Sequence, residues 1–187
     1  MGKITWRGGA LIAPIPAVLV SSGTVENPNV MTAAWTGIIN TIPAKTYVSI
    51  RPERYSHEII SKTKEFVINL TTSELAYATD WCGVKSGKQI NKFEKMKLTP
   101  EKVTKIEAPA VGESPVNLEC KVTDIIKLGS HDMFLADIVA VNVDEKLIDK
   151  NGKLHLDKAN LIAYSHGEYF ELGKKIGKFG YSVKKKK

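Results

Sequence analysis

The segment "NLECKVTDIIKLGSHDMFLADIVAVNVD", residues 117–144, decides the fold class of this 187-residue chain. Its two halves, residues 117–128 and 132–144, are rich in Val and Ile, which favour β-strands. They are joined by "GSH", a loop length typical of hairpins, in which Gly129 is available for a positive φ angle. The segment therefore predicts a long antiparallel hairpin in a fold that is mainly β.

Other segments extend this prediction, because they are also rich in Val, Ile, Thr and aromatic residues and bounded by Gly, Pro, Asn or Ser. Further strands are expected at residues 10–22, 30–40, 46–50 and 65–70. A second hairpin is expected at residues 22–29, where Gly, Pro and Asn gather in one connection. The chain shows no internal repeat or linker, so we predict one domain, a β-barrel or sandwich.

Short helices are expected between the strands. Ser56 is a plausible N-cap for a helix at residues 57–64. Thr71 and Glu74 have the spacing of a capping box before residues 75–81. Residues 89–96 are a third candidate, and Thr99 before Pro100 predicts a further helix or turn start. These short helices are expected to lie at the periphery of the β-structure.

The net charge of +7 is concentrated at the C-terminal end. Seven of the 27 basic residues and none of the 20 acidic residues follow Gly173, so the rest of the chain is balanced. Residues 174–187 are predicted to be a basic tail, which is either a solvated terminus or a binding element. A nucleic-acid-binding barrel, using this tail and the lysines of residues 85–97, is a disfavoured alternative, because aromatic residues for base stacking are lacking.

Cysteine content and hydropathy bear on the compartment. The two cysteines, Cys82 and Cys120, imply no disulfide framework and are expected to be buried free thiols. The apolar run at residues 10–20 contains two prolines and is too short to span a membrane. It also lacks the layout of a secretory signal, so we expect a cytoplasmic protein without a membrane partner.

The sequence lacks the motifs of several common catalytic and cofactor-binding sites. No GxGxxG follows a strand, and "GVKSGK", residues 83–88, lacks the spacing of a P-loop. The four histidines share no metal-ligand spacing with each other or with the cysteines, so no metal site is expected. Neither a CxxC pair nor a GxSxG elbow occurs. If the protein is an enzyme, a bound cofactor is expected to carry the chemistry.

A basic cluster lies in "YVSIRPERYSHEII", residues 47–60, where a strand leads into a helix start. Arg51, Arg54, Tyr55 and Ser56 collect two guanidinium groups, two hydroxyls and unpaired backbone N–H groups, which suit a phosphate or carboxylate. Alternatively, the arginines form surface ion pairs with nearby glutamates while Ser56 only caps the helix. This segment alone leaves both readings open.

Two more segments carry candidate binding residues. In "NVMTAAWTG", residues 29–37, small alanines leave the backbone accessible to a flat ligand, although the pattern also fits a packed barrel strand. In "DWCGVKSGKQINKFEKMKL", residues 80–98, a flexible turn at Ser86 and Gly87 precedes a short amphipathic helix with Lys92 and Phe93. Its lysines alone could serve solubility only.

Taken in order, these segments together with "VNLECKV" and "GSHDMFLADIVAV" resemble the flavin reductase-like family of FMN-binding split β-barrels, closest to its flavoredoxin branch. The resemblance covers about residues 10–173. It implies a Greek-key split β-barrel that forms a homodimer and binds one FMN noncovalently in each subunit, near the dimer interface. Residues 1–187 would then form a single FMN-binding domain with the tail at its end.

The resemblance also implies the roles of individual residues. The isoalloxazine ring would lie along Thr32, Ala33, Ala34, Trp35 and Thr36. The phosphate would be surrounded by Arg51, Arg54, Tyr55, Ser56, Ser86, Gly87 and Lys92, with Phe93 beside them. His131 matches a position facing the flavin or nicotinamide, where it could orient the reductant or lend a proton, although a turn histidine without a role is the alternative.

The implied function is an oxidoreductase or electron carrier that passes electrons through FMN. The reductant would be NADH or NADPH stacking on the flavin, or a redox protein partner as in a flavoredoxin. A flavin-binding protein without enzymatic activity is the other alternative within the same resemblance.

Overall fold

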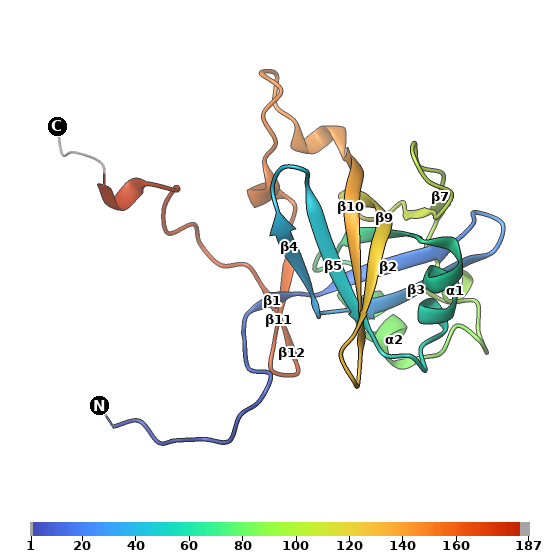
Figure 1. Ribbon diagram of the computed structural model, residues 1–187. Helices are drawn as coiled ribbons and strands as arrows, with labels where there is room; N and C mark the ends of the chain where they lie inside the picture. Colours follow the sequence, from blue (N-terminus) through green and yellow to red (C-terminus); the bar gives the residue numbers. More distant parts are fainter. Residues whose placement is uncertain (1, 184–187) are drawn as a thin grey trace.

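The predicted long hairpin is confirmed in the computed structural model, which describes residues 2–183. Strands β9 (Val116–Lys127) and β10 (Asp132–Val143) pair antiparallel from Val116 opposite Val143 to Lys127 opposite Asp132. Gly129 adopts a φ of +98° in the connecting turn, a conformation that glycine reaches without steric cost. The hairpin crosses the molecule and ends in an exposed tip (Figure 1).

The hairpin is the centre of a seven-stranded antiparallel sheet with the order β3-β2-β6-β9-β10-β5-β4. The remaining strands are β2 (Val18–Gly23), β3 (Pro28–Ala33), β4 (Thr36–Asn40), β5 (Lys45–Ile50) and β6 (Glu65–Leu70). The β9–β10 pairing shifts register twice, between Leu135 and Ala136 and between Ile138 and Ala140. Such bulges bend strands and increase their twist, so the sheet curls into a partly open barrel (Figure 1).

Smaller elements surround this sheet. A second sheet has the order β1-β11-β12, and β7 pairs with β8. Their bounds are β1 (Ile15–Pro16), β7 (Pro100–Glu101), β8 (Ala110–Val111), β11 (Ile162–Ser165) and β12 (Glu168–Glu171). The helices are α1 (Tyr55–Thr63), α2 (Ala76–Val84) and α3 (Lys92–Met96), with single 3₁₀ turns at Glu145–Leu147, Leu156–Lys158 and Tyr181–Val183.

The core explains where the helices lie. One face of the sheet buries Val18, Val20, Phe66 and Phe134, with Ile60 of α1 packed into the same cluster. The other face of β2 and β3 is covered by α2 and α3, where the buried cluster comprises Leu19, Val30, Leu75, Ala78, Cys82, Phe93, Leu98 and Val111. Because both faces of β2 are buried, its first half, Val18 to Val20, is apolar at every position instead of alternating. The same packing fixes α2 and α3 beside β3.

Two of the expected strands differ in extent from the structure, and one hairpin was not expected. The strand expected at residues 30–40 is two strands, because the chain leaves β3 after Ala33 and enters β4 at Thr36. Of the strand expected at residues 10–22, the part from residue 15 onward is β-structure, and it is divided between β1 and β2, which belong to different sheets. The β11–β12 hairpin was not predicted. The break between β3 and β4 leaves Ala34 and Trp35 outside regular strand pairing, so a ligand can lie against them.

The predicted helix starts were wrong at two positions. Helix α1 begins at Tyr55 with Arg54 at its N-cap, because the buried Ser56 hydroxyl instead accepts a hydrogen bond from Asn29. Helix α2 begins at Ala76, and the Thr71 hydroxyl donates to the Ala17 carbonyl at 2.5 Å instead of capping it. In both cases a tertiary partner takes the side chain that the local pattern assigned to a cap.

The helix or turn expected from Thr99 is likewise replaced by β7. The Thr99 hydroxyl donates to Glu113 at 2.7 Å, and Pro100 lies opposite Val111 in the β7–β8 pair. A long-range strand pair therefore overrides the local signal.

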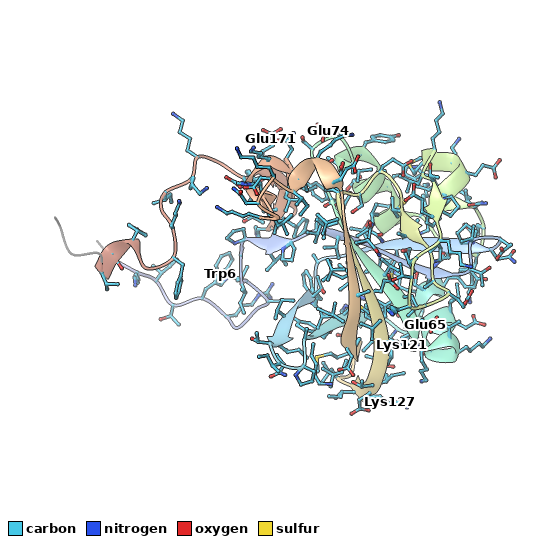
Figure 2. All side chains as sticks on the ribbon, turned by 90° about the horizontal axis from the view of Figure 1, so that it is seen from above. Trp6, Glu65, Glu74, Lys121, Lys127 and Glu171 are labelled. Atoms are coloured by element: carbon cyan, nitrogen blue, oxygen red, sulfur yellow. The ribbon has the colours of Figure 1, made fainter. Side chains whose placement is uncertain are left out.

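Both ends of the described chain extend away from the barrel on the side of β4 and β12 (Figure 1). Trp6 lies on the N-terminal arm away from the barrel body and is 73% exposed (Figure 2). Of the predicted basic tail, Lys184–Lys187 lie outside the described residues, and Lys175 pairs with Asp157 at 2.9 Å. Among residues 2–183, no helix is both long and apolar enough to cross a membrane.

Candidate functional site

Two adjoining cavities lie beside β3 and share Met31, Arg51 and Arg54. The first, which we call the tryptophan cavity because Trp35 lines it, has a volume of about 380 Å³. The second, which we call the basic cavity, has a volume of about 390 Å³ and lies between β3, the start of α1 and the loop after α2. The shared residues make the two cavities one elongated site.

The basic cavity gathers most of the predicted phosphate residues. It is lined by Asn29, Met31, Arg51, Glu53, Arg54, Tyr55, Ser56, Lys85, Ser86, Gly87 and Lys92. The strand β5 ends at Ile50 and α1 begins at Tyr55, so this short connection directs both arginines toward the loop after α2. Three segments far apart in the sequence therefore meet around one concentration of positive charge.

The two arginines are held differently. Arg54 donates from Nη1 to the Gly83 carbonyl at 2.9 Å, which ties the start of α1 to the end of α2. Arg51 is half exposed, and its Nη1 lies 3.4 Å from Glu53 Oε1. Glu58 pairs with Lys62 at 2.8 Å and Lys88 at 3.7 Å. Of the expected surface ion pairs, only the one between Arg51 and Glu53 forms, and an exposed pair of this kind contributes little stability.

Lys92 is the most unusual group in the basic cavity, because its side chain is buried at 4% exposure. Its ammonium donates to the Cys82 carbonyl at 2.8 Å. Among residues 2–183, no carboxylate lies within ion-pair distance of it. Burial lowers the pKa of Lys92 to about 8, and the nearby Arg54 guanidinium acts in the same direction. A buried cation without a counter-charge is costly, which favours an anion as the occupant of this cavity.

Asn29 and Gly87 form part of the wall of the basic cavity. Asn29 is buried, and its Nδ2 donates to Ser56 Oγ at 2.8 Å and to Ser22 Oγ at 3.3 Å. A Cβ added at Gly87 would overlap Asn29 Oδ1 and lie 3.1 Å from the Tyr55 ring. Only glycine therefore lets the loop after α2 approach β3 this closely.

The residues around the break between β3 and β4 form one wall of the tryptophan cavity. Thr32, Ala33, Ala34 and Trp35 all line it, and the Thr32 hydroxyl donates to the Thr79 carbonyl of α2. Trp35 is 41% exposed, and its ring stacks at 14° on the His131 ring with a centroid distance of 6.5 Å. Two alanines and a stacked aromatic pair provide a flat surface of small and π-rich groups.

Part of this cavity was missed in the sequence. Tyr164 and Tyr169 of the β11–β12 hairpin line it, together with Asp80 of α2. The Tyr169 hydroxyl donates to Asp80 at 3.3 Å, and burial together with this carboxylate raises the pKa of Tyr169 to about 12. The segment "AYSHGEYF", residues 163–170, contains a His-Gly turn between two aromatic-containing runs, a hairpin signal that could have revealed this wall.

Two predicted residues lie apart from the cavities. Thr36 is buried in β4, and its hydroxyl donates to the Tyr47 carbonyl at 2.6 Å. Phe93 is 2% exposed and packs in the core under α2. The other predicted residues line one or both cavities, namely Thr32, Ala33, Ala34, Trp35, Arg51, Arg54, Tyr55, Ser56, Ser86, Gly87, Lys92 and His131.

A polar contact connects the two ends of the site. His57 Nε2 lies 2.9 Å from Asp132 Oδ2, and the His57 ring packs edge-on against Phe134 at a centroid distance of 5.1 Å. His57 follows Ser56 in α1, whereas Asp132 follows His131 at the hairpin tip. The contact therefore holds the basic cavity and the tip of the β9–β10 hairpin in a fixed relation.

The two cysteines are predicted to be unreactive. Burial raises the pKa of Cys82 to about 11 and that of Cys120 to about 12, and both thiols are fully buried. Because only the thiolate attacks disulfide reagents, we expect the native protein to show almost no labelling by such a reagent at pH 8. The same protein in guanidinium chloride should yield two thiols. Rapid labelling of native Cys82 would contradict this expectation.

Comparison with known proteins identifies the fold and family. The model of the flavin reductase like domain matches residues 12–173. An uncharacterised protein of Archaeoglobus fulgidus is 34% identical over 157 residues, which are 84% of this chain and 87% of that protein. Flavoredoxin of Desulfovibrio vulgaris (Miyazaki F) has a solved structure that matches with a TM-score of 0.90 at 29% identity, covering 98% of this chain and 100% of its own.

A solved structure from Shewanella frigidimarina with a split barrel domain matches with a TM-score of 0.78 at 24% identity, covering 88% of this chain and 84% of its own. This likeness concerns the fold and agrees with the curled seven-stranded sheet. The predicted split β-barrel is therefore confirmed. The match over residues 12–173, together with the 34% identical relative, shows that the chain belongs to the flavin reductase-like domain family.

Proposed function

We propose that this protein binds FMN noncovalently in the two joined cavities and acts as an oxidoreductase or electron carrier. The observation that carries the proposal is the buried Lys92 ammonium, which lies with two arginines in a cavity that opens into a flat, aromatic one. An anionic group at one end and a planar ring system at the other are what FMN presents. The likeness to flavoredoxin supports the same assignment.

The basic cavity fits a phosphate monoester. Such a group carries between one and two negative charges near neutral pH and presents several acceptor oxygens. Arg51, Arg54 and Lys92 offer three positive charges, and Ser56 and Ser86 offer hydroxyl donors. A phosphate would compete with Glu53 for Arg51, because a charge-assisted contact in a partly enclosed cavity is stronger than an exposed ion pair. These residues would hold the cofactor. A side chain at position 87 would overlap Asn29, so glycine is required in this wall of the cavity.

The tryptophan cavity fits the isoalloxazine end. Ala33 and Ala34 present no side chain that would project far into the cavity, while Trp35 and His131 offer stacked rings at its edge. Bound FMN would supply hydride and single-electron chemistry, which no side chain provides. His131 is proposed to orient the reductant or hold a proton at its imidazole, whose Nδ1 lies 2.9 Å from Ser130 Oγ. The reductant is proposed to be NADH or NADPH, or a redox protein.

The visible spectrum tests this proposal directly. We expect the purified protein to be yellow, to bleach under dithionite, and to release FMN on denaturation. Adding NADH and NADPH in separate anaerobic samples would then identify the reductant. A holoprotein that bleaches only with dithionite or a reduced protein partner would indicate an electron carrier. A colourless protein that binds no added FMN would overturn the proposal.

A homodimer is proposed from the exposed apolar side of the barrel. β4 is an edge strand of the sheet, and it and the following turn expose Ile38 at 68% and Ile42 at 89%. An exposed apolar edge is prone to pair with another chain. The extended arms lie on the same side (Figure 1). A second copy covering this side would bury these groups close to Trp35, which precedes β4.

Light scattering after gel filtration is expected to give twice the 20.6 kDa chain mass. The double change Ile38→Lys and Ile42→Lys should shift the protein toward the monomer, because lysines desolvate poorly at an apolar contact. Tyr77→Lys on α2, where the side chain is 74% exposed, serves as the matched control and should leave the mass unchanged. A wild-type monomer across micromolar concentrations would contradict the homodimer.

A further inference from the structure

We propose that Asn29 is a positioning residue that directs the proton of the Ser56 hydroxyl into the basic cavity, toward the anionic ligand. The proposal rests on the proposed function, because it concerns how the cavity prefers FMN over a flavin without phosphate. Asn29 does not donate to the ligand in this proposal. It acts through Ser56, whose hydroxyl lies between the two.

Asn29 is the donor in both side-chain hydrogen bonds to the neighbouring serines. Its amide nitrogen carries two protons, and two hydroxyl oxygens are placed to accept them, Ser56 Oγ at 2.8 Å and Ser22 Oγ at 3.3 Å. All three side chains are buried, with exposures of 5% for Asn29, 2% for Ser56 and 0% for Ser22. Burial without bulk water makes each of these bonds costly to lose. One amide group therefore donates to two serines, Ser22 of strand β2 and Ser56 of helix α1.

The consequence lies in what the Ser56 hydroxyl can still do. A hydroxyl has one proton to donate and lone pairs with which to accept. Within residues 2–183, Ser56 Oγ accepts from Asn29 but donates to no protein group. By contrast, Thr63 in the same helix donates to the Ile59 carbonyl at 3.1 Å, as helical hydroxyls often do. Ser56 thus keeps its proton for a partner in the basic cavity, which it lines.

The oxygen side of Asn29 fixes the orientation of the amide. Gly87 packs so closely that a Cβ there would overlap Asn29 Oδ1. The loop carrying Ser86 and Gly87 thereby lies directly against the amide on one side, while both serines lie on the other. Asn29 therefore joins the three segments that bound the cavity, namely β3, the start of α1 and the loop after α2.

The test is a double-mutant cycle on apoprotein, with FMN and riboflavin as matched ligands that differ only in the phosphate. Ser56→Ala is expected to weaken FMN binding on the order of tenfold, because a hydrogen bond to a charged phosphate is lost. Asn29→Ala should weaken FMN binding by a similar factor, since the Ser56 hydroxyl becomes free to rotate. Riboflavin affinity should change less than twofold in both variants. Asn27→Ala, at an exposed position of the turn that precedes β3, is the matched control and should change neither affinity.

The cycle separates the proposal from its alternatives. If Asn29 acts through Ser56, adding Asn29→Ala to Ser56→Ala should cause almost no further loss of FMN affinity. Full additivity, or an equal loss for riboflavin, would overturn the proposal while leaving FMN binding intact. Failure of the wild-type protein to bind FMN would instead overturn the proposed function, and this inference with it. Should Asn29→Ala not fold, Asn29→Ser, which retains a donor of shorter reach, must show the same phosphate-specific loss.

Discussion

Replacing Arg51 and Arg54 together with alanine is expected to weaken FMN binding by two to three orders of magnitude and riboflavin binding by less than about threefold. Each guanidinium would form charge-assisted hydrogen bonds to the phosphate, and such bonds contribute roughly 1.5–3 kcal/mol each. Riboflavin lacks the phosphate, so its affinity reports on the ring end of the site alone. Both arginines line the basic cavity and the tryptophan cavity.

Single variants separate the two arginines. Arg51 is half exposed, and among residues 2–183 its side chain pairs only with Glu53, so Arg51→Ala should act on the phosphate alone. Arg54 also holds the Gly83 carbonyl, so Arg54→Ala should additionally lower the melting temperature. Arg7→Ala on the exposed N-terminal arm is the matched control for charge, and it should leave both affinities unchanged. Fluorescence titration of both flavins provides the measurement, and equal losses for FMN and riboflavin would show that the arginines do not hold the phosphate.

FMN affinity is expected to fall as the pH rises through about 8, because Lys92 of the apoprotein loses its proton there. The neutral amine no longer attracts the phosphate, so binding above this pH requires proton uptake. Lys92→Met should weaken FMN binding on the order of 100-fold at pH 7 and remove the pH dependence above neutrality. Lys95→Met, at an exposed position of the same helix, is the matched control. An unchanged pH dependence in Lys92→Met would exclude Lys92 as its source.

The stability of the apoprotein should respond to pH in the opposite direction. The pKa of Lys92 lies at about 8 in the folded chain and near the usual 10.5 when unfolded. Between these values the unfolded chain binds more protons, so the free energy of unfolding should rise with pH. The maximum gain is on the order of 3 kcal/mol. Denaturant unfolding of the apoprotein at pH 7.5 and pH 10 measures it, and Lys92→Met should not show this gain.

The hairpin illustrates how much of the fold local sequence could predict. Residues 117–144 carry strand-forming residues and a turn with a suitably placed glycine, and the structure follows this pattern closely. The helix starts at Ser56 and Thr71 were predicted from equally familiar patterns and were wrong. A cap depends on where one hydroxyl finds its partner, and the partners came from distant segments, Asn29 of β3 and Ala17 between β1 and β2.

In the candidate site, too, some features could be predicted from local sequence and others depended on tertiary contacts. The types of residue needed for an anion were visible around Arg51 and Ser86, since guanidinium, ammonium and hydroxyl groups are recognisable in any segment. The burial of Lys92 was not visible, because the same short helix also carries the exposed Lys95, and local sequence does not distinguish the two lysines. The contact between Asp80 and Tyr169 in the wall of the tryptophan cavity could also be recognised only from the fold, since the two residues are 89 positions apart in the sequence.

The sequence by itself determined the β-rich class and the types of residue available for an anion site, because strand propensity, turn chemistry and side-chain functional groups are local properties. Its resemblance to a known family indicated the family and the residues that line the site. The tertiary structure alone decided that Lys92 is buried without a carboxylate, that Asn29 donates to Ser56, and that two cavities join at Arg51 and Arg54. These features depend on which distant segments the curled sheet brings together, and burial and hydrogen-bond direction are set only by those neighbours.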